Sequence, residues 1–388
     1  MTADERARPA PPLAGLKVLD FSTLLPGPLA TLLLAEAGAE VLQLERPPRG
    51  DEMRGYQPRL GESSANYALL NRGKRSAAVD LKDPTVRERL LELAAEADVV
   101  VEQFRPGVMD RLGLGYEAFR TVNPGIVYCS VTGHGQTGPA AARAGHDLNY
   151  LAESGLLGSV VDDRGDPHLP PTVIADIAGG TYPAVVNILL ALFRRNATGA
   201  GCHLDVAMTA NLSTLAYGYL ATHACSGTWP APGRDLLTGG SPRYHVYRTS
   251  DGRHVAAAPL EDRFWLRFCE LVGLPEDLRA DAGREDEVIN AVAARIAART
   301  AEHWHDLFEG EDVCCCIVAT LEEAAGSQAL RTESPHRVAG EGFDVSALPV
   351  PVVDELRSEP TSLSYPPLRT GPEALTFHRA AESPGSPA

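Results

Sequence analysis

The sequence predicts an α/β protein with a large, doubly wound, Rossmann-like domain and a smaller α+β domain. Its 388 residues suggest two domains, at roughly 150 residues per domain. Short runs rich in Val and Ile alternate with helical patterns in the first half of the chain, which is typical of a parallel sheet covered on both faces. The pattern changes to a hairpin and amphipathic helices after a stretch rich in Gly and Pro.

The large domain is expected to begin with strands and helices in alternation. The predicted strands are short apolar runs at 17–21, 40–45, 76–81, 98–102 and 125–131. The predicted helices lie between them at 29–37, which Gly38 ends, and at 84–97, which Pro84 begins. A buried helix at 185–193, a strand at 202–206 and a helix at 210–224 follow.

The small domain is expected to start after a linker at 226–241. Runs at 244–247 and 254–257 flank Ser250-Asp251-Gly252, which predicts a hairpin. A helical stretch at 285–308 and a strand at 314–318 complete it. We therefore expect a large domain over 1–225, a small domain with its linker over 226–330, and a C-terminal segment over 331–388. That segment is expected to return to the large domain and to end in a disordered tail from Glu382.

The charge balance disfavours two classes of partner. Lys and Arg number 35 against 51 Asp and Glu, a net charge of −16, which repels nucleic acid and anionic membranes. No uninterrupted apolar run reaches the about 20 residues of a membrane span, and residues 1–12 lack the apolar core of a signal peptide. The seven cysteines lack the spacing of metal ligands, so we expect no metal site and a reducing compartment such as the cytoplasm. Cys314-Cys315-Cys316 precede Ile317 and Val318, which predicts a buried strand in which Cys is a small apolar residue.

Basic residues cluster at three places in this acidic chain: Arg46 with Arg49, the run 71–75, and Arg105 with Arg111. The first and last groups directly follow predicted strands, and open α/β sheets bind ligands beyond the carboxyl ends of their strands. Such clusters favour a polyanionic small molecule such as a phosphorylated cofactor, and ordinary solvated loop charge is the alternative.

Two glycine-containing segments are candidates for a functional site. Gly133–Gly138 matches GxGxxG, but Pro139 follows it and it comes after the fifth strand, which favours a tight functional loop over a dinucleotide fingerprint. His146 and Asp147 lie in a run of small residues, and Asp176 precedes Gly179-Gly180. Taken alone, His146 is more often structural than catalytic, and Asp176 suits a helix cap as well as a ligand site.

With these residues in place, the chain resembles the family III CoA-transferase superfamily and is most similar to its alpha-methylacyl-CoA racemases. The segments that carry the resemblance run in chain order: 12–20, 70–76, 80–82, 102–116, 145–150 and the region around Asp176. The resemblance implies an interlocked homodimer whose active site lies between the large domain of one subunit and the small domain of the other. It also implies an acyl-CoA substrate, so that coenzyme A enters with the substrate and no prosthetic group is expected.

The resemblance assigns roles to residues. It implies CoA contacts at Arg46, Asn71, Arg72, Lys74, Arg105, Arg111, Gly145, Asp147 and Tyr150. In the racemases, the residues that match His146 and Asp176 are acid/base groups on opposite faces of the substrate α-carbon, and Glu261 is the best match for a Glu that pairs with the His. If neutral His146 takes the proton, Asp176 has to be protonated, which demands a raised pKa.

The transferase branch gives Asp176 a different role. There the matching carboxylate attacks the acyl-CoA and forms a mixed anhydride and then an aspartyl-CoA thioester, and His146 is not required. A non-catalytic CoA-binding protein is a third possibility that the fold alone would allow. The combination of His146, Asp176 and Glu261 favours the racemase.

Overall fold

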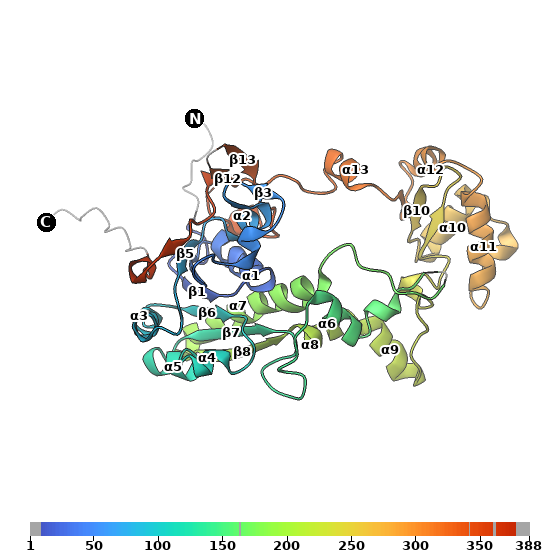
Figure 1. Cartoon of the computed structure of the whole chain (residues 1–388). Coiled ribbons are helices and arrows are strands. Elements are labelled where there is room, and N and C mark those ends of the chain that lie inside the picture. The colour runs from blue at the N-terminus through green and yellow to red at the C-terminus, as the bar shows by residue number, and fades with distance from the viewer. Residues whose placement is uncertain (1–8, 163, 341, 360–361, 378–388) are drawn as a thin grey trace. The chain divides into compact units, whose positions relative to one another are not determined.

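The computed structural model describes residues 9–162, 164–340, 342–359 and 362–377, and these form two compact units (Figure 1). The first unit contains the described residues of Met1–Ser154, Pro171–Ser213 and Arg331–Ala388, and the second contains those of Gly155–Pro170 and Thr214–Leu330. The sequence places 155–170 and 214–225 in the large domain, whereas this division assigns them to the second unit. One cause is a backbone hydrogen bond of 3.1 Å from Gly233 to Ser159, which holds part of that segment on the linker. The expected tail from Glu382 lies outside the described residues.

A seven-stranded sheet forms the centre of the first unit. Its strands, in spatial order, are β15 (Arg369–Thr370), β5 (Arg75–Ala78), β2 (Glu40–Glu45), β1 (Lys17–Phe21), β6 (Val99–Glu102), β7 (Val127–Thr132) and β8 (Cys202–Ala207). All neighbouring strands are parallel. The order of the strands along the chain reverses between β1 and β6. Doubly wound sheets bind ligands at such a reversal, beyond the carboxyl ends of the strands. The predicted parallel α/β sheet is confirmed; β15, two residues long, is too short to show a periodic pattern.

Helices cover both faces of this sheet (Figure 1). On one face lie α1 (Pro26–Glu36) and α7 (Tyr182–Thr198), and on the other α3 (Pro84–Ala94) and α5 (Tyr116–Val122). One core cluster fills the layer between the sheet and α3 and α5, and it includes Leu19, Leu42, Leu90 and Phe119. The predicted helices at 29–37 and 84–97 are therefore confirmed, with ends shifted by up to three residues.

Helix α7 is only half buried, which corrects the prediction of a buried helix at 185–193. Ala184, Ile188, Ala191 and Leu192 form its buried stripe, because only this side meets α1, β7 and β8. Phe193 on the other side is 79% exposed. Together with the preceding π-helical turn, Ala175–Thr198 is long and apolar enough to cross a membrane by length and composition alone, a test that core helices of soluble proteins also pass.

Shorter elements complete the first unit. The helices are α2 (Ala65–Asn71), α4 (Val108–Arg111), α6 (Asp147–Glu153) and α8 (Met208–Asn211). A hairpin pairs β3 (Arg59–Leu60) with β4 (Ser63–Ser64), and a separate sheet has the order β13 (Phe343–Ser346), β12 (Arg337–Gly340), β14 (Ser362–Leu363). Glu36 at the end of α1 is fully buried, pairs with Arg72 and lies 2.9 Å from His336 Nε2. This ion cluster joins the C-terminal segment to the helical layer.

The second unit contains an antiparallel sheet with the order β11 (Cys315–Ile317), β10 (His254–Ala257), β9 (His245–Arg248). Its helices are α9 (Tyr217–Ser226), α10 (Asp262–Leu271), α11 (Glu285–Ile296), α12 (Ala301–Phe308) and α13 (Leu321–Gly326). The predicted hairpin is confirmed. The predicted helix at 210–224 is divided between α8 and α9, and the stretch at 285–308 is divided between α11 and α12.

Cys315 and Cys316 lie on the edge strand β11 and Cys314 directly precedes it, so the prediction of a buried strand is wrong in this respect. Cys314 and Cys316 are exposed, and only Cys315 packs against the core of the second unit. Because side chains alternate between the two faces of a strand, Cys316 on β11 faces away from the core that Cys315 contacts. The apolar composition of 314–318 predicts a strand correctly, but composition does not show whether a strand lies at the edge or in the centre of a sheet.

The core of the first unit supports a stability prediction. Leu42 on β2 is 0% exposed and belongs to the core cluster between the sheet and α3 and α5, so we expect Leu42→Ala to lower the free energy of unfolding by about 2 to 5 kcal/mol. Leu356, which is 49% exposed, is the matched control, and its replacement by Ala should change this free energy by about 0.5 kcal/mol or less. Urea unfolding measures both, and equal effects would contradict the described packing.

Candidate active site

Two segments far apart in the sequence meet at the candidate site. His146 and Asp147 stand at the start of α6, and Asp176 stands in a π-helical turn, Ala175–Thr181, that leads into α7. The backbone N–H of Asp176 donates to Asp147 Oδ1 at 2.9 Å, across 29 residues of chain. His146 is held at the helix start because its own backbone N–H donates to Asn149 Oδ1 at 3.0 Å. The predicted acid/base pair is thus brought into one region of the first unit.

The Asp176 carboxyl has an unusual electrostatic environment. Its pKa is raised to about 6, first because burial disfavours the ionised form and second because the Asp147 charge repels a further negative charge; His146 lowers it in part. Asp147 is 8% exposed, whereas the His146 side chain is exposed. A carboxyl that titrates near neutrality, close to an imidazole open to solvent, is suited to proton transfer.

Tyr150 holds the loops around this pair. Its hydroxyl donates to the Gly145 carbonyl at 2.6 Å, and its side chain is 5% exposed. A Cβ atom at Gly133 would lie 2.5 Å from the Tyr150 ring, and one at Gly145 would lie 2.7 Å from it, so both positions require glycine. The residues at 145–150 are therefore packed on the loop that follows β7, and the Tyr150 hydroxyl is committed to this contact.

The GxGxxG segment is a tight loop, as the sequence predicts. The Gly135 N–H donates to Thr132 Oγ1 at 2.9 Å, and the Gln136 N–H donates to Asp205 Oδ2 at 2.9 Å. These contacts close the loop on the ends of β7 and β8, and in the described chain no helix starts directly after it as in a dinucleotide-binding turn.

Small residues bring the π-helical turn close to its neighbours. A Cβ atom at Gly179 would lie 2.5 Å from the Met208 carbonyl oxygen, and Asn211 Nδ2 donates to the Gly179 carbonyl at 2.8 Å. Thr181 Oγ1 donates to the Pro26 carbonyl at 2.8 Å, which ties the turn to the start of α1. The sequence analysis missed Thr181 and Asn211; the only signal was the Gly179-Gly180 pair, which indicates close backbone approach. π-Helical turns occur frequently at functional sites.

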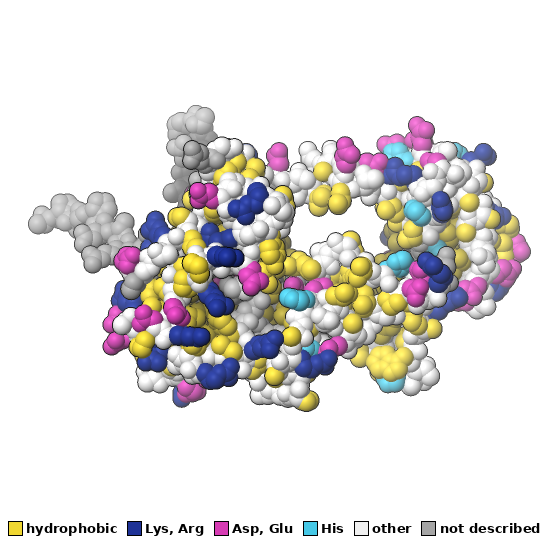
Figure 2. Space-filling model, viewed as in Figure 1, with side chains coloured by type: hydrophobic (Ala, Val, Ile, Leu, Met, Phe, Trp, Pro, Cys, Tyr) yellow, Lys and Arg dark blue, Asp and Glu magenta, His cyan; other side chains and the backbone are white. Residues whose placement is uncertain are grey.

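Arg46 and Arg105 are available to an anionic ligand. Arg46 is the first residue after β2 and Arg105 is the third residue after β6, and these two strands flank β1 at the reversal of strand order. Both side chains are exposed, and neither has an ion-pair partner among the described residues. Arg111 on α4 is exposed as well. On the face drawn in Figure 2, Lys and Arg side chains gather on the first unit although the net charge is −16.

Asn71, Arg72 and Lys74 are buried and already have partners. Lys74 Nζ donates to the Pro28 carbonyl at 2.9 Å and to Asn71 Oδ1 at 2.8 Å, and lies 3.4 Å from the Asp20 carboxylate. Arg72 pairs with the buried Glu36, and burial lowers the pKa of Arg72 to about 10. These side chains hold the first unit together, so their role toward CoA stays a prediction.

Glu261 belongs to the second unit. It precedes α10 and its side chain is exposed. Its pairing with His146 stays a prediction, because the two residues lie in different units. Among the described residues, His, Cys, Asp and Glu side chains form no group of three or more that could hold a metal ion.

The raised pKa of Asp176 predicts a pH-dependent effect on stability. Because the folded-state pKa lies above that of the unfolded chain, ionisation of Asp176 destabilises the fold as the pH rises from about 4 to about 6. Asp176→Asn removes this penalty, so we expect about 1 to 2 kcal/mol of added stability at pH 7.5, allowing for partial exposure, and little at pH 4. Urea unfolding at both pH values measures it, with the exposed Asp306→Asn as control. Equal effects at the two pH values would contradict a raised pKa.

The chain is similar to proteins of known family over most of its length. Residues 13–364 match the model of CoA-transferase family III. Alpha-methylacyl-CoA racemase of Homo sapiens is 35% identical over 88% of this chain and 86% of that protein, and succinyl-CoA:glutarate CoA-transferase of Homo sapiens is 36% identical over 78% and 70%. The crystal structure of Rv3272 from M. tuberculosis superposes with a TM-score of 0.78 at 28% identity, over 95% of this chain and 100% of that one. The chain therefore belongs to CoA-transferase family III.

Proposed function

We propose that the protein is an acyl-CoA racemase that moves the α-proton of a 2-methylacyl-CoA thioester through His146 and Asp176. The observation that supports this most is the raised pKa of Asp176 beside His146. A racemase needs one group that takes a proton and a second, still protonated, that returns one. Burial and the Asp147 charge favour the protonated Asp176 that this pairing requires.

In the proposed reaction, neutral His146 removes the α-proton, and the C–H electron pair moves into an enolate of the thioester. Protonated Asp176 then delivers its proton to the opposite face of the α-carbon, which leaves imidazolium and carboxylate. The reverse reaction exchanges the two roles. Asp147 is a positioning residue here, because it holds the backbone of Asp176 and its charge opposes ionisation of that carboxyl.

We assign the phosphates of CoA to the carboxyl edge of the central sheet. Arg46 and Arg105 follow β2 and β6, are exposed and have no ion-pair partner among the described residues. Guanidinium groups bind phosphate oxygens with paired N–H donors, which suits the pyrophosphate and the 3′-phosphate. CoA then enters and leaves as part of the substrate.

We also propose a homodimer in which Glu261 of the partner subunit pairs with His146. The apolar side of α7 supports an additional protein contact, since Val186, Leu190 and Phe193 are 53%, 62% and 79% exposed. Large apolar side chains at neighbouring positions on one surface are typical of interfaces. The paired carboxylate would orient the imidazole and stabilise its charged form during turnover.

CoA transfer is the second candidate, and the similarity to succinyl-CoA:glutarate CoA-transferase favours it. In that reaction the ionised Asp176 attacks the thioester carbonyl and releases CoA thiolate, which leaves a mixed anhydride. The thiolate then attacks the aspartyl carbonyl, releases the acyl group as a carboxylate and forms an aspartyl-CoA thioester. His146 has no required part in these steps.

Exchange of the α-proton distinguishes the two reactions. We expect the protein to replace the α-proton of 2-methylbutanoyl-CoA by deuterium in D₂O without an acceptor acid, as loss of its proton NMR signal. His146→Ala should slow this exchange at least about 100-fold because it removes one of the two groups, and Asp176→Ala should do the same. The exposed His303→Ala serves as a control and should leave the rate unchanged.

Mass spectrometry of the protein with acyl-CoA tests the alternative. A peptide containing Asp176 that carries CoA as a thioester, together with absence of α-proton exchange in the wild type, would contradict the racemase and establish the transferase. Exchange without such an adduct supports the racemase.

The arginine assignment gives a separate prediction. We expect Arg46→Ala with Arg105→Ala to raise KM for acyl-CoA about 10-fold or more with little change in kcat, because the phosphates are bound equally before and during reaction. The salt dependence of kcat/KM should weaken with the loss of these charges. Arg120→Ala is the matched control, since Arg120 is paired with Glu117 on the surface. Unchanged KM in the double variant would place the phosphates elsewhere.

A further inference from the structure

The two strands that flank β1 each end in a buried glutamate, and an exposed arginine follows each of them. Glu45 ends β2 and directly precedes Arg46, and Glu102 ends β6 and lies three residues before Arg105. The two glutamates are 3% and 4% exposed. Because a buried carboxyl is costly unless it has hydrogen-bond partners, the groups that each glutamate holds indicate its role.

At the end of β2, the glutamate closes the loop that carries Arg46. Glu45 Oε2 accepts the backbone N–H of Asp51 at 2.7 Å. Arg54 binds both carboxylate oxygens of Glu45, through Nε and Nη2, each at 2.7 Å. The Gly50 N–H donates to the Arg46 carbonyl at 2.9 Å. The backbone on which Arg46 stands is therefore held within a short closed loop.

At the end of β6, the glutamate holds the turn that carries Arg105. Glu102 Oε2 accepts the backbone N–H of Phe104 at 2.8 Å. The Phe104 side chain packs against the core cluster between the sheet and α3 and α5. Gln103 Oε1 accepts the Gly27 N–H at 3.0 Å, which ties the turn to α1. Arg105 follows these anchored residues with its own side chain exposed.

Glu102 is not held in place by an opposite charge, because it has no ion-pair partner among the described residues. Burial, and to a smaller extent the charges of Asp110 and Asp205, raise the pKa of Glu102 to about 7. Hydrogen bonds from the Ser130 hydroxyl and the Phe104 N–H lower this pKa in part. Ionisation of Glu102 is thus unfavourable at this position, which indicates that the site uses the acceptor oxygen rather than the charge.

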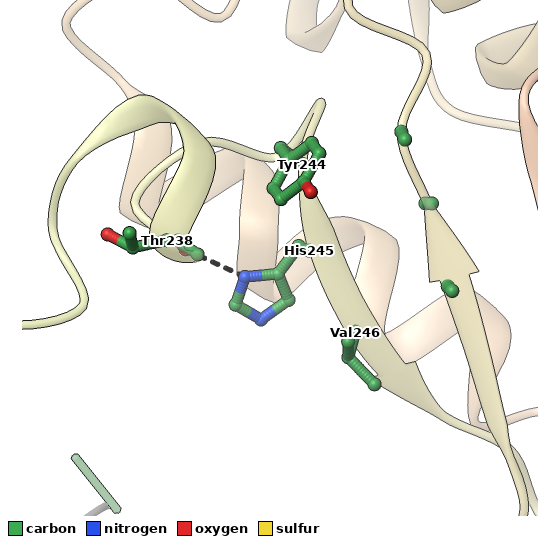
Figure 3. A pocket seen from close by; sticks show the side chains of 8 residues that line it. Thr238, Tyr244, His245 and Val246 are labelled. Atoms are coloured by element: carbon green, nitrogen blue, oxygen red, sulfur yellow. Dashed lines mark hydrogen bonds between the residues drawn. The ribbon is translucent and has the colours of Figure 1, made fainter. Parts of the chain in front are cut away.

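Two pockets of the second unit do not supply a free cation for a phosphate. One, of about 390 Å³, is lined by His245, whose Nδ1 lies 2.8 Å from the Gly239 carbonyl oxygen, and its other lining residues are uncharged (Figure 3). The other is lined by three arginines that each have a carboxylate partner: Arg234 with Asp286, Arg243 with Asp281, and Arg284 with Glu287. These pockets therefore give no reason to move the phosphate assignment away from Arg46 and Arg105.

We propose that Glu102 is a positioning residue for phosphate binding, which holds Arg105 at the carboxyl edge of the sheet through the Phe104 N–H. This rests on the proposed function in one respect, since it takes Arg105 to bind a phosphate of CoA. Arginine binds phosphate through paired N–H donors in a fixed geometry, so a turn that moves loses part of this contact. Loss of the Glu102 acceptor should therefore weaken CoA binding only while Arg105 is present.

Calorimetric titration of the full chain with coenzyme A at pH 6 tests this role. Most of the Glu102 carboxyl is protonated at this pH, so a neutral replacement changes the local charge little. We expect Arg105→Ala to raise the Kd about 5-fold or more, and Glu102→Ala, which removes the acceptor, to raise it about 3-fold or more. Glu102→Gln retains an oxygen acceptor for the Phe104 N–H and should leave the Kd within about 2-fold.

A double-mutant cycle separates positioning from a general loss of structure. In the Arg105→Ala background, Glu102→Ala should have no further effect, so that the double variant has the Kd of Arg105→Ala within about 2-fold. Leu90→Ala removes a fully buried side chain of α3 and is the control for lost stability. Its effect on the Kd should be the same with and without Arg105. Near-ultraviolet circular dichroism verifies that each variant is folded.

The results also separate the positioning role from the proposed function. An unchanged Kd in Glu102→Ala, an equally raised Kd in Glu102→Gln, or an effect of Glu102→Ala that persists without Arg105 would each overturn the positioning role alone. An unchanged Kd in Arg105→Ala would contradict the phosphate assignment and the positioning role together. The expected Kd pattern, combined with absence of α-proton exchange in the wild type, would contradict the racemase and leave the positioning role standing.

Discussion

The candidate site depends on one constraint, that all seven strands of the central sheet are parallel. Each crossover has to bring the chain back to the same edge, so the segments after the strands all collect at the carboxyl edge. This places Arg46 and Arg105 on either side of β1, and it places the loop after β7 against the segment of His146 through Tyr150. The glycines at 133, 145 and 179 then permit backbone approaches that no larger residue would allow.

The contact between Asp147 and Asp176 affects both the position and the pKa of the Asp176 carboxyl. A carboxylate that accepts the backbone N–H of Asp176 holds the π-helical turn in place, and the same negative charge makes ionisation of Asp176 less favourable. One residue therefore both positions a carboxyl and favours its protonated form. The exposed imidazole of His146 is the other member of the proposed pair, and the proposed reaction needs one of the two groups to take a proton while the other returns one.

The sequence predicts most of the central sheet because long, periodic apolar runs such as 98–102 and 125–131 leave a clear pattern. It does not predict β15 or β12 to β14, which are two to four residues long; β15 pairs with the distant β5, β14 pairs with β12, and β12 and β13 form a short hairpin. The sequence also overestimates the burial of Cys314 to Cys316 and of α7. Apolar composition does not show whether a residue lies in the core, on an edge strand or on an exposed helix face. Of the site, proximity of His146 and Asp176 followed from resemblance rather than from spacing. The buried pairing of Arg72 and Lys74 with acidic partners was not foreseeable, because it depends on Glu36 and Asp20 from other elements.

The central claim is that the pKa of Asp176 is raised because its carboxyl is buried beside Asp147. The most direct measurement is a carbon-13 NMR titration of the aspartate carboxyls in the full chain, with the Asp176 signal assigned by its loss in Asp176→Asn. The account predicts a midpoint of about 6 for Asp176, moving to lower pH in Asp147→Asn, which retains an acceptor for the backbone N–H but not the charge. A midpoint at about 3.9, the ordinary value for an aspartate, that is unaffected by Asp147→Asn would contradict it.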